Sequence, residues 1–170
     1  MRTAGILMPI TSLPSPYGVG TLGQCARDFI QFLHRAGQTY WQILPICPTG
    51  YGDSPYQSFS SYAGNPYMID FDDLKKEGLL QEEEYASISW GDNLARVDYS
   101  LLYSHKFSIL RIACSRISGV LSERFQTFCK EQNVWLNDYA LYMSIKDYYD
   151  GQSWQEWPET LQKREKDSLE

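Results

Sequence analysis

The chain opens with an apolar run, an amphipathic helical pattern and a second apolar run, all within its first 46 residues. Ala4–Ile10 shows little polar alternation, as expected of a strand buried on both faces. Thr21, with Gln24 three residues later, forms a capping-box pattern for a helix, and Gly37 is placed to end that helix. Tyr40–Ile46 resembles a second strand. A strand–helix–strand unit this short requires two parallel strands and a right-handed crossover, so the sequence predicts the opening of an α/β fold.

The rest of the chain is predicted to be mainly helical. Apolar side chains at three- and four-residue steps predict one long amphipathic helix over Tyr103–Phe128, kinked or loosened near Gly119. A further helix contains Trp135 and ends before Gly151, and Pro158 is suited to the first position of the next. We therefore expect two parts, a βαβ unit over residues 1–70 and a mainly helical region over residues 71–170.

Composition excludes several classes of partner. The 170 residues have a net charge of −6, and Lys and Arg are scattered, which argues against nucleic acid or an anionic membrane as the main partner. The N-terminal apolar run is too short for a signal peptide, and no stretch approaches the ~18 apolar residues of a membrane span. The four cysteines lack metal-ligand spacing and are predicted to be reduced core thiols of a cytoplasmic protein, with no metal.

Two loops follow the predicted strands, residues 11–20 and 47–66, and ligands of α/β folds bind beyond the carboxyl ends of such strands. The second loop exceeds the ~12–15 residues beyond which an irregular loop is usually functional or disordered. Its four aromatic residues argue against disorder, and Asp53 is its one charged residue. This mixture suits a neutral polyhydroxyl ligand, with rings for sugar faces and short polar groups for hydroxyls. The alternative is that the rings only pin the loop to the rest of the fold.

The second loop also contains an eleven-residue irregular motif, Gly50–Ser60, followed by Ala63–Pro66. Four further motifs accompany it in order along the chain: Thr11–Gly20, Tyr40–Pro45, Trp135–Leu141 and Ser153–Pro158. Together they resemble the N-terminal portion of the 4-α-glucanotransferase (amylomaltase) family, densely over the first 70 residues and more sparsely from 71 to 132.

The resemblance implies a (β/α)₈ TIM-type barrel, of which this chain holds the opening βαβ part followed by a helical insertion. It implies a retaining transferase of starch, glycogen and maltodextrin metabolism that moves α-1,4-glucan segments to the 4-hydroxyl of an acceptor glucan or glucose, with no cofactor. Such chemistry needs two carboxyl groups about 5 Å apart. In the family they lie on later strands, so no catalytic residue is assigned here and the chain alone is expected to be inactive.

The family's substrate contacts can be carried over to the second loop. Tyr56 resembles the ring that lines the donor sugar next to the scissile bond, and Ser54 a hydroxyl contact near the same bond. Tyr51 resembles an aromatic residue that holds glucan slightly away from the cleavage point. Asp53 is assigned to the same substrate-binding loop, although its place between two turn-forming residues favours anchoring a tight turn over acid–base work.

Two details qualify the resemblance. Met8 stands where many members of the family have His, so either a polar contact at the end of the first strand is lost or Met8 is a variant without consequence. Asp70, Asp72 and Asp73 follow a short strand-like segment and are expected to form a helix cap and its first turn rather than a catalytic pair.

Two other classes of function remain open at this point. The chain could be a free-standing, non-catalytic carbohydrate-binding module that uses the Tyr-rich loop alone, or a structural α/β domain whose aromatic residues are all core. The partners expected are α-1,4-glucans, with no nucleic acid and no membrane, and the open strand edges allow the chain to self-associate.

Overall fold

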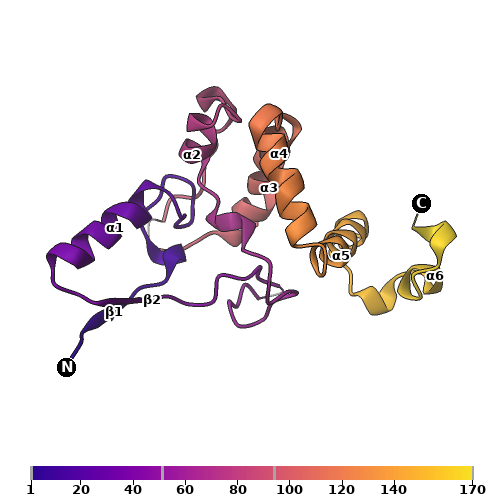
Figure 1. Ribbon diagram of the computed structural model, residues 1–170, viewed down its shortest axis with the longest axis horizontal. Helices are drawn as coiled ribbons and strands as arrows, with labels where there is room; N and C mark the ends of the chain where they lie inside the picture. The colour runs from indigo at the N-terminus through magenta and orange to yellow at the C-terminus, as the bar shows by residue number, and fades with distance from the viewer. Residues whose placement is uncertain (1, 51, 94, 170) are drawn as a thin grey trace. The chain divides into compact units, whose positions relative to one another are not determined.

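The computed structural model describes residues 2–50, 52–93 and 95–169. Strands β1 (Gly5–Leu7) and β2 (Tyr40–Gln42) pair in parallel, with Ile6 opposite Trp41. Helix α1 (Gln24–Arg35) connects them and lies along one face of the pair (Figure 1). The predicted strand–helix–strand unit with parallel strands is therefore confirmed.

Both strands are shorter and more exposed than predicted. Beyond Leu7 the backbone makes one more ladder hydrogen bond, from the Met8 N–H to the Gln42 carbonyl at 3.0 Å. The next residue, Pro9, has no N–H to donate, and the chain turns into a 3₁₀ helix. Ile6 and Leu7 remain 37% and 57% exposed, so the prediction of a strand buried on both faces is wrong for this chain. Among the described residues the sheet has two strands of three residues each, shorter than the predicted runs Ala4–Ile10 and Tyr40–Ile46.

The predicted capping box of α1 is also wrong. The residue before the helix is Gly23, and no side chain caps it. The Thr21 hydroxyl instead donates to Asp70 Oδ2 at 2.5 Å, 49 residues further along the chain. A Cβ at Gly23 would lie 2.0 Å from that carboxylate oxygen, so the absence of a side chain allows this close approach. At the other end, Gly37 has φ +67° and ends the helix as predicted.

The remainder is helical and irregular. Asp70 accepts a hydrogen bond from the Asp73 N–H at 3.2 Å and begins α2 (Phe71–Lys76), which confirms the predicted cap. The single long helix predicted over Tyr103–Phe128 is wrong. The chain forms α3 (Tyr99–Ser115) and α4 (Gly119–Glu131), separated by residues 116–118, and Gly119, the first residue of α4, has φ +54°. The other elements are α5 (Leu136–Tyr148), α6 (Glu159–Gln162) and 3₁₀ turns at Ile10–Ser12, Pro66–Met68, Glu82–Glu84, Trp154–Glu156 and Lys166–Ser168.

Contacts divide the chain into two compact units, Met1–Ser122 and Glu123–Glu170. In the first unit the largest core cluster joins the 11–20 loop to α2, α3 and the segment between them: Tyr17, Phe71, Leu79, Leu80, Tyr85, Ile109 and Ala113. In the second unit, Trp157 is 6% exposed and its ring lies 5.4 Å from that of Tyr142 and 6.4 Å from that of Tyr149. The division into a βαβ part and a helical insertion after residue 70 stays a prediction.

Over the described ranges, no helix is both long and apolar enough to span a membrane, and no group of His, Cys, Asp and Glu is arranged to hold a metal ion. All four cysteines are free. Cys114 is exposed and the other three are partly exposed, so the prediction that they are core thiols is wrong.

Candidate glucan-binding site

A backbone hydrogen bond joins the two ends of the loop after β2. The Asn65 N–H donates to the Ile46 carbonyl at 2.7 Å, and the Asn65 side chain accepts from the Tyr67 N–H at 2.9 Å. Asn65 is buried, so these bonds form away from solvent, where an unpaired polar group would be costly. The carboxyl end of β2 therefore leads into a loop whose ends are fixed together.

Within the loop, short-range hydrogen bonds satisfy the backbone. The Gly50 N–H donates to the Gln57 carbonyl and the Gln57 N–H to the Ser54 carbonyl, both at 3.1 Å. Further along, Ser60 Oγ accepts from the N–H groups of Tyr62 and Ala63 at 3.1 Å each. A loop with this many internal bonds is ordered without regular secondary structure.

Large aromatic side chains project from this ordered loop. Tyr56 is 73% exposed, Tyr62 75% and Phe59 40%. The Tyr56 backbone N–H is held at 3.3 Å from Ser54 Oγ, which links two of the residues predicted to contact a donor sugar. An exposed ring on a fixed backbone offers a flat apolar face at low entropic cost, as sugar recognition requires.

Asp53 anchors the loop to α3. It has φ +55°, a left-handed conformation that Asp tolerates better than most residues. Its carboxylate accepts a hydrogen bond from the Tyr103 hydroxyl. Burial and this bond both raise the pKa of Tyr103, so the phenol stays a donor at neutral pH. This bond ties the turn to a helix side chain, and the contact predicted between Asp53 and a substrate stays a prediction.

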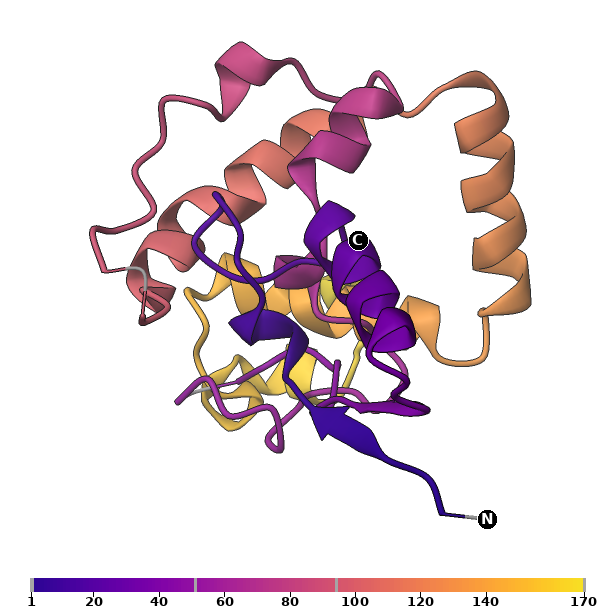
Figure 2. The same cartoon turned by 90° about the vertical axis from the view of Figure 1, so that its left-hand side faces the viewer.

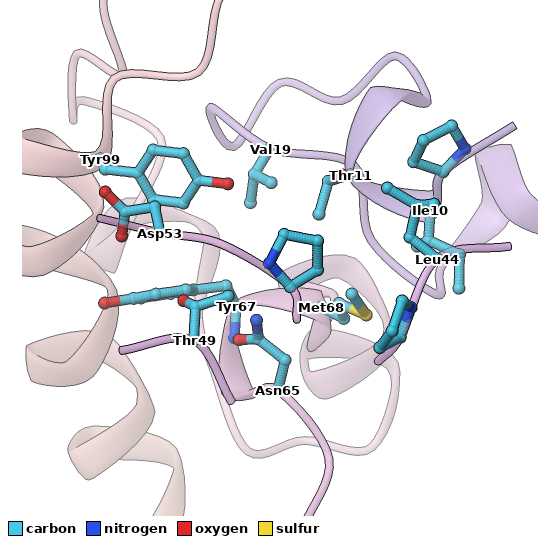
Figure 3. Close-up of a pocket in the computed structure, with 13 residues that line it drawn as sticks. Ile10, Thr11, Val19, Leu44, Thr49, Asp53, Asn65, Tyr67, Met68 and Tyr99 are labelled. Carbon is cyan, nitrogen blue, oxygen red and sulfur yellow. The ribbon is translucent and has the colours of Figure 1, made fainter. Parts of the chain in front are cut away.

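A small cavity of about 40 Å³ lies behind the loop, where the chain leaves both strands (Figure 3). Thr11 and Leu44, from the segments after β1 and β2, line one side, and Asp53 and Tyr99 line the other. The Thr49 hydroxyl also lines it and is buried without a protein partner among the described residues. The parallel topology thus brings the two predicted loops together, as expected for the carboxyl ends of neighbouring strands.

The four predicted substrate residues have different outcomes. Tyr56, Ser54 and Asp53 lie together on the second loop, whereas Tyr51 lies outside the residues that the structure describes. Their contacts with a sugar stay a prediction. Met8, in place of the family's common His, packs against a small apolar cluster, and its carbonyl accepts from Trp41 Nε1 at 2.8 Å.

Sequence reasoning missed the α3 side chains that hold the loop. Tyr67 is buried, with its ring centroid 5.8 Å from that of Tyr103 and 5.7 Å from that of Phe107. Tyr99 lies one helical turn before Tyr103, and its pKa is raised by burial and by the Asp53 charge. Two tyrosines four residues apart on one helix face were the available signal, but they fit an ordinary core face equally well.

Comparison with known proteins shows the family to which the chain belongs. Residues 8–170 match the family model described as 4-alpha-glucanotransferase, and the chain belongs to that family, corresponding to its N-terminal portion. It is 48% identical over 172 residues to the 4-alpha-glucanotransferase of Thermus thermophilus, covering 99% of this chain and 33% of that protein. With the enzyme of Clostridium butyricum it shares 43% identity over 163 residues, which is 96% of this chain and 34% of that protein.

A solved structure agrees. Amylomaltase from Streptococcus agalactiae, determined in complex with acarbose, superimposes with a TM-score of 0.94 at 39% sequence identity. The match covers 99% of this chain and 34% of the amylomaltase chain. The chain therefore spans about a third of the length of the relatives that it matches.

Proposed function

We propose that a protein of the relatives' full length containing this chain transfers α-1,4-glucan segments to the 4-hydroxyl of an acceptor glucan or glucose, and that this chain supplies donor-glucan contacts. The observation that supports it most is the TM-score of 0.94 to an amylomaltase in complex with acarbose. The ordered loop after β2 has exposed rings and one charged side chain, which suits a neutral α-glucan.

In this proposal Tyr56 presents its ring to the donor sugar beside the scissile bond, and Ser54 offers its hydroxyl to a sugar hydroxyl nearby. Tyr51 contacts glucan further along, and Asp53 fixes the turn through Tyr103. The reaction is a retaining double displacement. A carboxylate bonds to the anomeric carbon while a carboxylic acid gives its proton to the leaving sugar oxygen. The acceptor 4-hydroxyl then displaces the carboxylate and returns a proton to the acid. Neither carboxyl group is assigned to this chain, and the fold proposed for the whole protein is the TIM-type barrel.

The test is disproportionation of maltotriose by the full-length protein. We expect wild type to convert two maltotriose molecules to glucose and maltopentaose, and the 170-residue chain alone to match a protein-free blank. Tyr56→Ala should lower kcat/KM by about 30- to 150-fold, or ~2–3 kcal/mol, because it removes a contact next to the reacting sugar. Tyr56→Phe should lose less, since it keeps the ring face. An unchanged kcat/KM in Tyr56→Ala would contradict the assignment of Tyr56, and no turnover by wild type would contradict the function.

A further inference from the structure

Among the residues that the structure describes, Lys106 of α3 is the one fully buried cationic side chain. Its Nζ donates to the Ile69 carbonyl at 2.7 Å. The same atom lies 4.1 Å from the centre of the Phe71 ring, where α3 passes beside the start of α2 (Figure 2). Lysine is almost never fully buried unless it is paired, so this position is unusual.

The surroundings of Lys106 satisfy its ammonium only in part. Within the described ranges, the one charge that acts on it is that of Asp70, whose oxygens already accept from the Thr21 hydroxyl at 2.5 Å and the Asp73 N–H at 3.2 Å. The ring of His105, the preceding residue of α3, packs edge-on against a tryptophan. One carbonyl and one ring face replace only part of the hydration of three N–H groups. Burial therefore lowers the pKa of Lys106 to about 7, so its charged and neutral forms coexist near neutral pH.

The carbonyl that Lys106 contacts belongs to the segment that closes the substrate loop. The loop ends at Asn65, whose carbonyl accepts from the Met68 N–H at 3.1 Å. The Ile69 N–H donates to the Pro66 carbonyl, also at 3.1 Å. One tight turn therefore joins the end of the loop to the residue that Lys106 contacts, and a shift of that residue moves the end of the loop.

The same part of α3 holds the loop at a second point. Tyr103, three residues before Lys106, donates to Asp53 in the loop. Phe107, the next residue, packs on Tyr67 just after the loop, with 5.7 Å between the ring centroids. Residues three and four positions apart lie on one face of a helix. Lys106 thus lies between two helix side chains that contact the loop and the segment after it.

We propose that Lys106 is a positioning residue for the donor-glucan loop: its neutral amine keeps α3 against the segment after the loop, and its protonation loosens that contact. Lys106 touches no substrate and acts through Ile69 and α3. The inference rests on the proposed function and adds a control of donor binding to it. A protonated Lys106 needs water for its remaining N–H groups, and admitting water moves α3 away from residues 69–71. The exposed rings of the loop then lose their fixed position, and the affinity for donor glucan falls.

Steady-state kinetics of the full-length protein on maltotriose test this, from about pH 5.5 to about pH 8.5, on both sides of the Lys106 pKa. Lys106→Met has neither the charge nor the donor. Its KM relative to that of wild type should rise from about one at the lowest pH to about five at the highest, the effect of one hydrogen bond, while the ratio of kcat values stays constant. Lys106→Gln keeps a neutral N–H donor, so it should recover a low KM at high pH and keep it at low pH. Lys130→Met, at an exposed position of α4, should behave as wild type at every pH.

Amide exchange separates this inference from the function on which it rests, because it does not require turnover. The protection factors of the hydrogen-bonded amides of Asp53 and Gln57 should fall below the Lys106 pKa in wild type and should not vary with pH in Lys106→Gln. A KM ratio that does not vary with pH, or a Lys106→Gln variant with the pH dependence of wild type, would overturn the inference and leave the proposed function intact. A wild type without turnover would contradict the proposed function, and the protection factors alone would then decide whether Lys106 positions the loop.

Discussion

Within the first compact unit, the strand–helix–strand region and the α2–α3 region bury their apolar side chains very differently. Around β1, α1 and β2, large apolar side chains remain exposed, among them Leu7, Ile30 and Phe32, each above half of its full exposure. Around α2 and α3, Phe71 and Leu102 are completely buried. Phe71 lies against the rings of Tyr17, Tyr85 and Trp90, which come from the segments before and after α2, so neighbouring segments cover this region more completely.

The candidate glucan-binding loop belongs to both regions but is anchored mainly to the second. Its N-terminal end follows β2, whereas Asp53 bonds to Tyr103 of α3 and Tyr67, just after the loop, packs on Tyr103 and Phe107. The position of the exposed rings therefore depends more on the helical contacts than on the sheet. These contacts hold the candidate loop in place although the sheet formed by the described residues has only two short strands.

The largest expected effect tests the buried region. Phe71→Ala removes a fully buried ring whose neighbours include Tyr17, Tyr85 and Trp90. We expect a loss of about 3–5 kcal/mol in the free energy of unfolding, measured by urea denaturation of the full-length protein, because the cavity cannot be filled without moving several rings.

The matched control is Phe32→Ala on α1, where the ring is 53% exposed and the loss should stay below about 1 kcal/mol. Equal losses in the two variants would show that α1 is covered as well as α2. The difference in burial between the two regions would then exist in the 170-residue chain but not in the full-length protein.

The second prediction concerns Lys106 of α3, which is fully buried. Its Nζ donates to the Ile69 carbonyl at 2.7 Å and lies 4.1 Å from the centre of the Phe71 ring. Burial lowers the pKa of Lys106 to about 7, with the Asp70 charge opposing that shift. Between that pKa and the usual value near 10.5, the unfolded chain binds more protons than the folded one, so the Lys106 contribution to stability rises with pH.

We therefore expect the stability of wild type relative to Lys106→Met to increase between about pH 7 and pH 10, by at most ~1.4 kcal/mol per pH unit. Urea denaturation of both proteins across this range measures it, and the subtraction removes tyrosine titration, which destabilises the fold above about pH 10. A difference that does not vary with pH would mean that Lys106 is hydrated in solution.

The smallest effect concerns the loop anchor. Tyr103→Phe removes the hydroxyl that donates to Asp53 but keeps the ring against Tyr67. We expect a loss of about 1 kcal/mol in stability and faster exchange at the amides of Asp53, Ser54 and Tyr56, because the turn loses its tie to α3. Tyr148→Phe, the same change at an 80% exposed ring on α5, is the control. If exchange at these amides is unchanged, the loop's internal hydrogen bonds keep the turn ordered without the bond from Tyr103.

Sequence patterns predicted the features that depend on short-range chemistry. The helix stop at Gly37 and the Asp70 cap follow from residues close together in the chain, and the parallel strand pair follows from the short strand–helix–strand pattern. Periodicity was less informative for Tyr103–Phe128, because the apolar pattern runs through both α3 and α4 although residues 116–118 leave the helix and Gly119 has a positive φ. A glycine in a helical pattern is compatible with a kink or with a break, and tertiary packing decides which.

Long-range pairings could not be predicted. Thr21 was expected to cap α1 but bonds to Asp70, and the Asp53 partner lies 50 residues away. Strand burial was wrong because the apolar pattern of Ala4–Ile10 predicts covering layers that the described chain does not provide. In the candidate site, the loop motif identified the exposed rings, whereas the α3 tyrosines that support them have no motif of their own.

Hydrogen exchange on the 170-residue chain tests the central comparison most directly, measured at low and high protein concentration. The account predicts strong protection at Leu102 and Ile109, and weak protection at Ile6, Leu7 and Ile43 in a dilute monomer, because the strands have few covering contacts. Protection of the strand amides should increase at high concentration if open edges pair between copies. Strong protection of Ile6, Leu7 and Ile43 in the dilute monomer would contradict the account and show that the strand–helix–strand region is stable without further partners.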